Sequence, residues 1–211
     1  MHLLTLYRKP LEEKSLIFVP DTNTWVRVSE CVWAPSNLQF PGKTSIAHSY
    51  GGLQLFFTLV LDIHSPDLEL HIAALKTYGK EEVVDPHVIK ELIKSISTLK
   101  PSPADLYTLK ASKIFFMRNN EKSKVNWYET FVIGDRKEYE DAFESDIVQG
   151  NLAILDFSLQ DVRTCRPFFD SMDTRSKYLS ALVEEQTEVD GGELNTSESL
   201  QISWKAEAIM R

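Results

Sequence analysis

The sequence predicts an α+β fold in which short antiparallel hairpins pack with several helices. Three pairs of a helix-capping residue and a proline mark helix starts, at Ser65-Pro66, Asp85-Pro86 and Ser102-Pro103. Runs of residues typical of strands flank two turns, at 20–23 and 119–120. Of the 211 residues, 43% are apolar and 26% are charged, so the chain can bury a core.

The clearest helices lie between residues 66 and 99. After Asp85, apolar residues recur at helical spacing and predict a helix over 86–99. The helix before it is expected from Pro66 to Tyr78, with Gly79 as its stop. The apolar run 53–63 fills both faces of either element, and for it we favour a buried helix over a buried strand.

Strand-forming residues predict two hairpins and one short strand. The first hairpin joins 16–19 to 25–28, and the second joins 113–118 to 125–133. Residues 153–156 form the short strand. This pattern of local hairpins between helices is the basis of the α+β prediction.

Further helices are expected near the C-terminal end. A capping box at Ser158–Asp161 predicts one helix, which Pro167 should end or kink. Residues 177–185 supply the next. Five residues on the apolar sides of the predicted elements are expected to be buried: Trp33, Ile93, Ile96, Leu155 and Phe168.

These elements predict two α/β lobes, 1–100 and 101–185, with the alternative that both form one domain. An acidic linker at 186–198 and a terminal helix at 199–211 follow. The stretch 184–198 carries six acids and no base, and the rest of the chain has 23 basic and 25 acidic residues. A body so close to neutral argues against nucleic-acid binding by bulk electrostatics.

The sequence also predicts an intracellular protein without a membrane span. Its first residues lack the basic patch and long apolar core of a secretory signal. The most apolar stretch, 53–63, has 11 residues, and a helix needs about 20 to cross a bilayer. The two cysteines, Cys31 and Cys165, lack CxxC or metal spacing and are expected to be buried thiols.

No motif predicts a catalytic, cofactor-binding or metal site, and no cofactor is expected. Gly42-Lys43-Thr44 resembles the end of a phosphate-binding loop, but Asn37 stands where that loop needs glycine. Cys31 and His48 are the residue types of a thiol nucleophile and its base, yet nothing in their surroundings selects them. The five histidines have neither HxH nor HExxH spacing.

Residues 110–128 interleave basic and aromatic side chains. Such a combination is used to pair with phosphates and to stack on bases of single-stranded nucleic acid. A packed hairpin with lysines in solvent explains the same pattern, because strands prefer aromatic residues. The residues that would contact nucleic acid are Lys110, Lys113, Arg118, Lys122, Lys124 and Trp127.

Several apolar segments together resemble one family. Over roughly residues 16–180 and the final helix, the chain resembles an internal region of large fungal proteins. These proteins carry an ATPase domain of the histidine-kinase/chaperone (GHKL) type and are related to sacsin and NO VEIN proteins. The segments that carry the resemblance are Ser29–Trp33, Lys113–Arg118, Leu155–Ser158, Arg166–Phe169 and Ser176–Ser180.

This resemblance implies a linker or transducer segment. In such proteins an upstream domain binds nucleotide through an Asn-bearing helix and an Asp-x-Gly-x-Gly loop, and neither pattern occurs in this sequence. The resemblance therefore implies no functional residue in this chain. Its implied partner is a protein, such as the ATPase domain of a related larger protein.

We therefore expect a non-catalytic interaction or scaffold segment. The alternative is a nucleic-acid-associated module that uses the 110–128 hairpin, with an unrecognised hydrolase as a third class. The apolar residues of the terminal helix favour a docking surface for another protein, although folding of this helix onto its own core would also cover them.

Overall fold

The computed structural model describes residues 14–118 and 120–183, and the backbone alone for 120–123. Its N-terminal part consists of small strands and short helical turns. These are β1 (Ile17–Val19), β2 (Thr24–Val26), η1 (Val28–Glu30), β3 (Cys31–Val32), β4 (Thr44–Ser45), α2 (Ala47–Tyr50), η2 (Gly51–Leu53) and the π-helical turn η3 (Phe56–Val60). We call residues 14–63 the N-terminal lobe.

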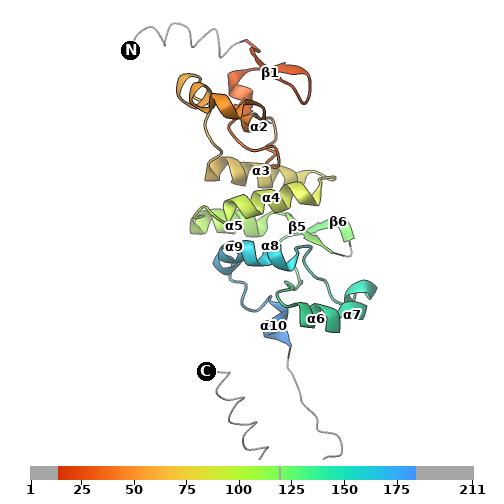
Figure 1. Cartoon of the computed structure of the whole chain (residues 1–211). Helices are drawn as coiled ribbons and strands as arrows, with labels where there is room; N and C mark the ends of the chain where they lie inside the picture. Colours follow the sequence, from red (N-terminus) through yellow and green to blue (C-terminus); the bar gives the residue numbers. More distant parts are fainter. Residues whose placement is uncertain (1–13, 119, 184–211) are drawn as a thin grey trace, which may run out of the picture.

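Longer helices and a second hairpin follow the lobe. In chain order they are α3 (Leu68–Lys80), α4 (Pro86–Ile96), α5 (Pro103–Ala111), β5 (Phe115–Met117), β6 (Asn120–Val125), α6 (Lys137–Ala142), α7 (Glu144–Gln149), α8 (Leu159–Thr164), α9 (Arg166–Ser171) and α10 (Leu179–Leu182). The molecule is elongated, with the lobe at one end, α6, α7 and α10 at the other, and α3, α4 and α5 stacked between them (Figure 1). The predicted α+β class is confirmed.

The first hairpin forms where it was predicted, although its second strand ends at Val26 and Val28 begins η1. β1 pairs antiparallel with β2, so that Phe18 lies opposite Trp25. In the turn, Asn23 adopts φ 52°, a left-handed conformation that asparagine tolerates, and its N–H donates to the Pro20 carbonyl (3.3 Å). The preference for helix in 53–63 is confirmed for Leu53 at the end of η2 and for η3, although neither is a regular α-helix. The expected burial of this run was wrong, because Leu55 and Leu59 are 72% and 75% exposed.

β3 connects the lobe to the rest of the protein because it contributes side chains to two separate cores. Successive strand residues point to opposite faces. Cys31 and Trp33 join the small core of the lobe, whereas Val32 and Ala34 join the main core. β4 pairs with β3 in parallel, with Cys31 opposite Thr44.

The helices α3 and α4 start and end slightly differently from the predictions. Asp67, not Ser65, caps α3: its carboxylate accepts a hydrogen bond from the Leu70 N–H (2.8 Å). The prediction that Gly79 stops this helix was wrong, because α3 runs to Lys80. Asp85 caps α4 as predicted, through the His87 N–H (2.8 Å).

The second hairpin uses a different return strand from the one predicted. β6 covers 120–125, and the prediction of a strand over 125–133 was wrong. Residues 126–129 form a turn directly after Val125, in which the Tyr128 N–H donates to Asn126 Oδ1 (2.9 Å). The predicted strand 153–156 makes single bridges instead of a ladder, from Leu155 to Met117 and from Ile154 to Val132.

The C-terminal helices are short. Ser158 and Asp161 form the predicted capping box at the start of α8. Pro167 does not kink that helix, which ends at Thr164; instead the proline lies in the first turn of α9, where its missing N–H costs nothing. Of the predicted helix 177–185, residues 179–182 form α10, while 184 and 185 lie outside the described residues.

The main core contains residues from both sides of residue 100. It extends from Val32 in β3 to Tyr178, and all five residues predicted to be buried are at most 9% exposed. The boundary between two lobes at residue 100 stays a prediction. The acidic linker 186–198 and the terminal helix 199–211 lie outside the described residues.

Candidate functional site

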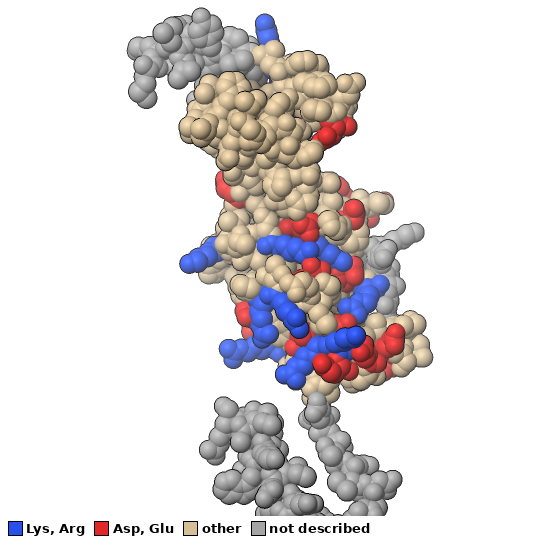
Figure 2. Space-filling view, in the orientation of Figure 1, with Lys and Arg blue, Asp and Glu red and all other residues tan. Residues whose placement is uncertain are grey.

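Large apolar side chains are exposed mainly on the N-terminal lobe. Twelve such side chains are exposed among the described residues, and seven of them lie between residues 16 and 60. Figure 2 shows this end of the molecule with few charged side chains, whereas charges cover the opposite end. The seven are Leu16, Trp25, Leu53, Leu55, Phe56, Leu59 and Val60.

Four of these side chains border a groove of about 370 Å³ between the β1–β2 hairpin and residues 50–61. Every residue that lines the groove is apolar or aromatic. The lining consists of Leu16, Ile17, Phe18, Trp25, Val28, Tyr50, Phe56, Phe57, Val60 and Leu61. We call this groove, together with the neighbouring exposed residues Leu53, Leu55 and Leu59, the apolar groove.

Buried contacts hold the two walls of the apolar groove together. Residues 50–61 form the helical wall of the groove. The Tyr50 hydroxyl donates to the Phe18 carbonyl (2.5 Å) and connects this wall to the hairpin. Phe57 is 5% exposed and packs on the rings of Trp33, Tyr50 and Phe56, with ring centroids 4.7–5.9 Å apart. The groove is therefore formed by the folded lobe itself.

The helical wall buries one face and exposes the other. Phe57 and Leu61, four residues apart, enter the small core of the lobe. Leu55 and Leu59, also four residues apart, are 72% and 75% exposed. A helix that is apolar on all sides is normally buried on all sides, so the outer face of this wall has the composition of a buried surface.

The apolar groove is also electrically neutral. Residues 44–61 contain no Asp, Glu, Lys or Arg. On the lobe surface, Asp21 pairs with His48 (3.2 Å) and Arg27 pairs with Glu30 (2.5 Å). A charged group that entered the groove would lose water without gaining a counter-ion, so the groove selects against charge.

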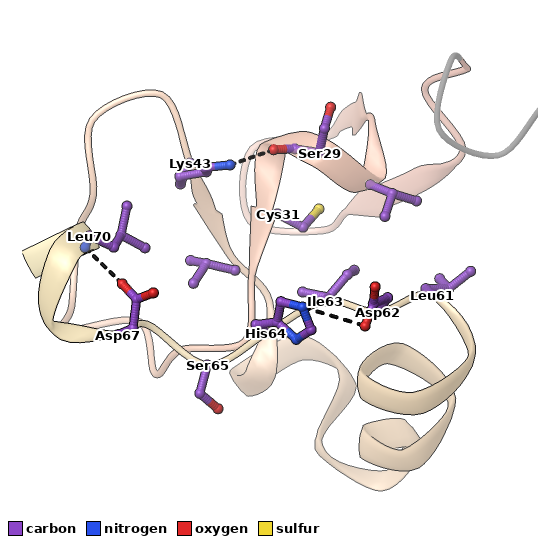
Figure 3. Close-up of a pocket in the computed structure, with 12 residues that line it drawn as sticks. Ser29, Cys31, Lys43, Leu61, Asp62, Ile63, His64, Ser65, Asp67 and Leu70 are labelled. Carbon is purple, nitrogen blue, oxygen red and sulfur yellow. Dashed lines mark hydrogen bonds and ion pairs between the residues drawn. The ribbon is translucent and has the colours of Figure 1, made fainter. Parts of the chain in front are cut away.

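A second, more polar pocket of about 540 Å³ lies where the lobe meets α3. Figure 3 shows Cys31 near its centre, with Lys43 and Ser29 above and His64 and Asp62 below in that view. The Lys43 ammonium donates to the Ser29 carbonyl (2.6 Å), and His64 lies 3.4 Å from Asp62. These contacts stabilise the loops around the pocket.

The thiol of Cys31 is unsuited to nucleophilic chemistry. Burial raises its pKa to about 11, so that the thiol stays protonated at neutral pH. Burial raises the pKa of Cys165 to about 11 in the same way, and both cysteines are buried as predicted. His48, the imagined base, does not line the pocket of Cys31 but pairs with Asp21 in the hairpin turn.

Neither a membrane span nor a metal cluster is found within residues 14–118 and 120–183. No helix there is both long and apolar enough to cross a bilayer. In the same residues, no group of three or more His, Cys, Asp and Glu side chains is placed to hold a metal ion. Lys43, from the sequence resembling a phosphate-binding loop, is held by Ser29 instead.

Three of the six residues proposed for nucleic-acid contact are used inside the protein. The Arg118 guanidinium pairs with Glu140 (2.8 Å), and the Lys124 ammonium donates to the Tyr78 carbonyl (2.6 Å) near the end of α3. Trp127 is 4% exposed and packs against three phenylalanine rings of the core.

The other three residues give a sparse basic surface. Lys113 is exposed and Lys110 half-buried, while the side chain of Lys122 lies outside the described residues. The only indole of this group is in the core, so it cannot stack on a base in this fold. The nucleic-acid alternative stays a prediction, and the geometry gives it little support.

A comparison with protein families finds a match for the C-terminal part of the chain. The family described as a domain of unknown function, DUF8348, matches residues 69–183. The chain belongs to this family. The DUF8348 region starts in α3 and ends just after α10, so the N-terminal lobe and its apolar groove lie outside it. No curated protein and no solved structure matches the chain.

The sequence analysis did not predict the apolar groove. The run 53–63 is apolar on both faces and was therefore expected to be buried. The one sequence signal for the groove is the lack of Asp, Glu, Lys and Arg in 44–61, and a buried segment would show the same pattern. Only the packing shows that Leu55 and Leu59 point away from the core.

Proposed function

We propose that this protein is a non-catalytic interaction module that binds a partner protein in the apolar groove of its N-terminal lobe. One observation carries the proposal: seven large apolar side chains are exposed together on one small lobe. Monomeric proteins rarely expose apolar patches larger than a few hundred Å², and such patches usually mark contact sites.

A protein fits this surface better than a membrane or a nucleic acid. Segments that bind membrane surfaces combine apolar residues with Lys and Arg, which attract anionic lipids. Nucleic acids require basic residues to neutralise phosphates. The lack of Lys and Arg in 44–61 removes both attractions and leaves burial of apolar area as the driving force.

The groove also indicates what the partner presents. Its lining is apolar and aromatic throughout, so the partner inserts uncharged side chains such as those on the apolar stripe of an amphipathic helix. The resemblance to segments downstream of GHKL-type ATPase domains stays a prediction. It makes such a domain, from a related larger protein, the first candidate to test.

The experiment removes the exposed residues and leaves the core intact. In Leu55→Ser/Leu59→Ser, two residues that are 72% and 75% exposed become polar. The matched control is Val83→Ser, which changes a residue that is 90% exposed and lies outside the lobe. Proximity labelling in the native host would compare the neighbours of the three chains, and isothermal calorimetry would follow with each purified neighbour.

We expect to find a neighbouring protein that binds the double variant at least about tenfold more weakly than the native chain, a loss of about 1.4 kcal/mol of binding free energy. Its affinity for the Val83→Ser control should equal its affinity for the native chain. If the three chains label the same neighbours and bind them with equal affinity, the groove is not the docking site. Circular dichroism and a denaturant titration show whether the double variant keeps the native fold.

A further inference from the structure

The helical wall of the apolar groove belongs to a continuous helical run over residues 47–60, which consists of α2, η2, residues 54–55 and η3. Leu55 and Leu59 lie four residues apart on the outer side of this run. Phe57 and Leu61 lie on the opposite side and enter the small core of the lobe. The outer side is therefore an apolar helical surface that the described part of the chain leaves uncovered.

Two glycines leave room for a second backbone beside these leucines. Gly51 and Gly52 precede Leu55 by four and three residues, which places them on its side of the run. Neither has a positive φ, and a Cβ atom added to either would meet nothing within 4 Å. The fold of one chain therefore does not require glycine there, although glycine weakens a helix relative to alanine. Glycines on a helix surface permit another backbone to approach closely.

The exposed apolar area of the lobe is enough for one side of a stable dimer. The exposed fractions of its seven large apolar residues range from 44% for Val60 to 75% for Leu59, and together equal about four fully exposed residues. At about 150–200 Å² for each, this area is roughly 600–800 Å². Stable and specific interfaces bury about 600–1,000 Å² on each partner.

The lack of charge favours a second copy over an unrelated protein. In a contact with two-fold symmetry the same patch meets itself, so charges on that patch tend to face charges of the same sign. Residues 44–61 contain no Asp, Glu, Lys or Arg. An interface between unrelated proteins normally pairs opposite charges, which steer association and select the partner. Charges cover the end of the molecule opposite the lobe, so contact between two lobes keeps these charges apart (Figure 2).

We propose that a second copy of this chain binds to the apolar groove, with the two 47–60 runs facing one another across a two-fold axis. This inference rests on the proposed function and names the partner. Leu55 and Leu59 of one copy then contact the same leucines of the other, and the glycines let the two runs approach. A symmetric contact of this kind covers the exposed leucines of both copies at once.

A charge-swap experiment on the full chain tests the proposal by sedimentation velocity. Leu55→Lys/Leu59→Lys places lysines of both copies against one another, and Leu55→Asp/Leu59→Asp does the same with aspartates. The matched control is Val83→Lys/Val148→Lys, which adds two lysines at residues that are 90% and 73% exposed and lie outside the lobe. Gly51→Gln/Gly52→Gln adds bulk on the same side of the run without charge.

We expect the native chain to pass from monomer to dimer over an about hundredfold concentration series. Each charged variant of the leucine pair should dimerise at least about hundredfold more weakly on its own, because like charges then meet. An equimolar mixture of the lysine and aspartate variants should associate more tightly than either variant alone. The glycine variant should also dimerise more weakly, whereas the control should dimerise as the native chain does.

A native chain that stays monomeric throughout the series overturns the proposal, whether or not the variants fold. The proposal also fails if both charged leucine variants dimerise as readily as the native chain, or if their mixture associates no better than each alone. A glycine variant that dimerises as the native chain does would contradict the facing of the two runs.

Failure of this inference is distinguishable from failure of the proposed function. The proposed function fails if Leu55→Ser/Leu59→Ser keeps all neighbours of the native chain with equal affinity. A monomeric native chain with a neighbour that requires Leu55 and Leu59 would overturn only the second copy as partner. Another protein would then be the occupant of the groove.

Discussion

The N-terminal lobe and the DUF8348 region treat apolar side chains in opposite ways. In the DUF8348 region the rings of Phe115, Trp127, Phe131 and Phe169 pack on one another and are at most 4% exposed. In the lobe a small core of seven buried residues lies beneath seven exposed large apolar ones. The DUF8348 region therefore buries its large apolar side chains in a stable core, whereas the surface of the lobe has the apolar composition of an interface.

Charged groups make the same distinction. In the DUF8348 region, Lys94 bridges Glu91 (2.8 Å) and Asp161 (2.6 Å), and Lys90 pairs with Asp156 (2.6 Å). These contacts join α4 to the start of α8 and leave the half-buried charges paired. Residues 44–61 of the lobe, by contrast, contain no Asp, Glu, Lys or Arg.

The largest effect is expected in the core of the DUF8348 region. Phe169→Ala should reduce the free energy of unfolding by about 3–5 kcal/mol, because it removes a buried ring that contacts three others. Denaturant titration measures the change. Tyr107→Ala, at a residue 70% exposed, is the control and should cost less than about 0.5 kcal/mol. If both variants lose a similar free energy of unfolding, the ring of Phe169 contributes no more to stability than the exposed ring of Tyr107, which would contradict the prediction.

A smaller and more local effect is expected in the lobe. Phe57→Ala should lower the free energy of unfolding by about 3 kcal/mol, the low end for removing a buried phenylalanine ring, since the small core around it can collapse partly. Hydrogen exchange should accelerate in 17–63 and stay slow in α4. If hydrogen exchange in α4 accelerates to the same extent, the lobe and the DUF8348 region unfold as one unit, and the proposed difference between them is wrong.

The third prediction concerns acid sensitivity, which the buried His71 should confer on the DUF8348 region. His71 Nδ1–H donates to the Asp67 carbonyl (2.6 Å), and Nε2 lies within hydrogen-bond distance of the Ser95 hydroxyl (2.8 Å). Burial lowers the pKa of His71 below its ordinary value of 6.5. The unfolded state then binds more protons, so the stabilisation is complete above pH 6.5 and is lost as the pH falls toward the folded-state pKa.

The slope of unfolding free energy against pH measures this effect. Between the lowered folded-state pKa and the unfolded-state pKa, His71 should contribute up to about 1.4 kcal/mol per pH unit. His71→Gln should remove that part of the slope. His64→Gln is the control, because the side chain of His64 is 77% exposed. An equal slope in His71→Gln and the native chain would contradict the assignment.

The smallest effect on stability is expected in the apolar groove. Leu55→Ser/Leu59→Ser should change the free energy of unfolding by less than about 0.5 kcal/mol, as is usual for exposed residues. Urea titration beside Val83→Ser measures it. A loss of several kcal/mol would place both leucines in the core and turn the groove into part of the folded body.

The sequence was sufficient wherever a local rule set the structure. Asp85 and Ser102 each cap the helix that follows, and Ser158 starts α8, because each side chain can reach an amide within its own turn. The burial of Ile93 and Phe168 followed from periodicity in the same way. Errors appeared at element ends, such as β6, where a polar turn at Asn126 competes with strand-forming residues beyond it.

The sequence by itself determined the α+β class, the main helix starts, the burial of the core residues and the two buried thiols. Tertiary structure alone decided which face of an apolar run meets water: Phe57 turns inward while Leu55 and Leu59 turn outward. It also decided that Trp127, Arg118 and Lys124 belong to the interior contacts of the body. The physical reason is that burial depends on which elements pack together, and residues far apart in the chain make those contacts.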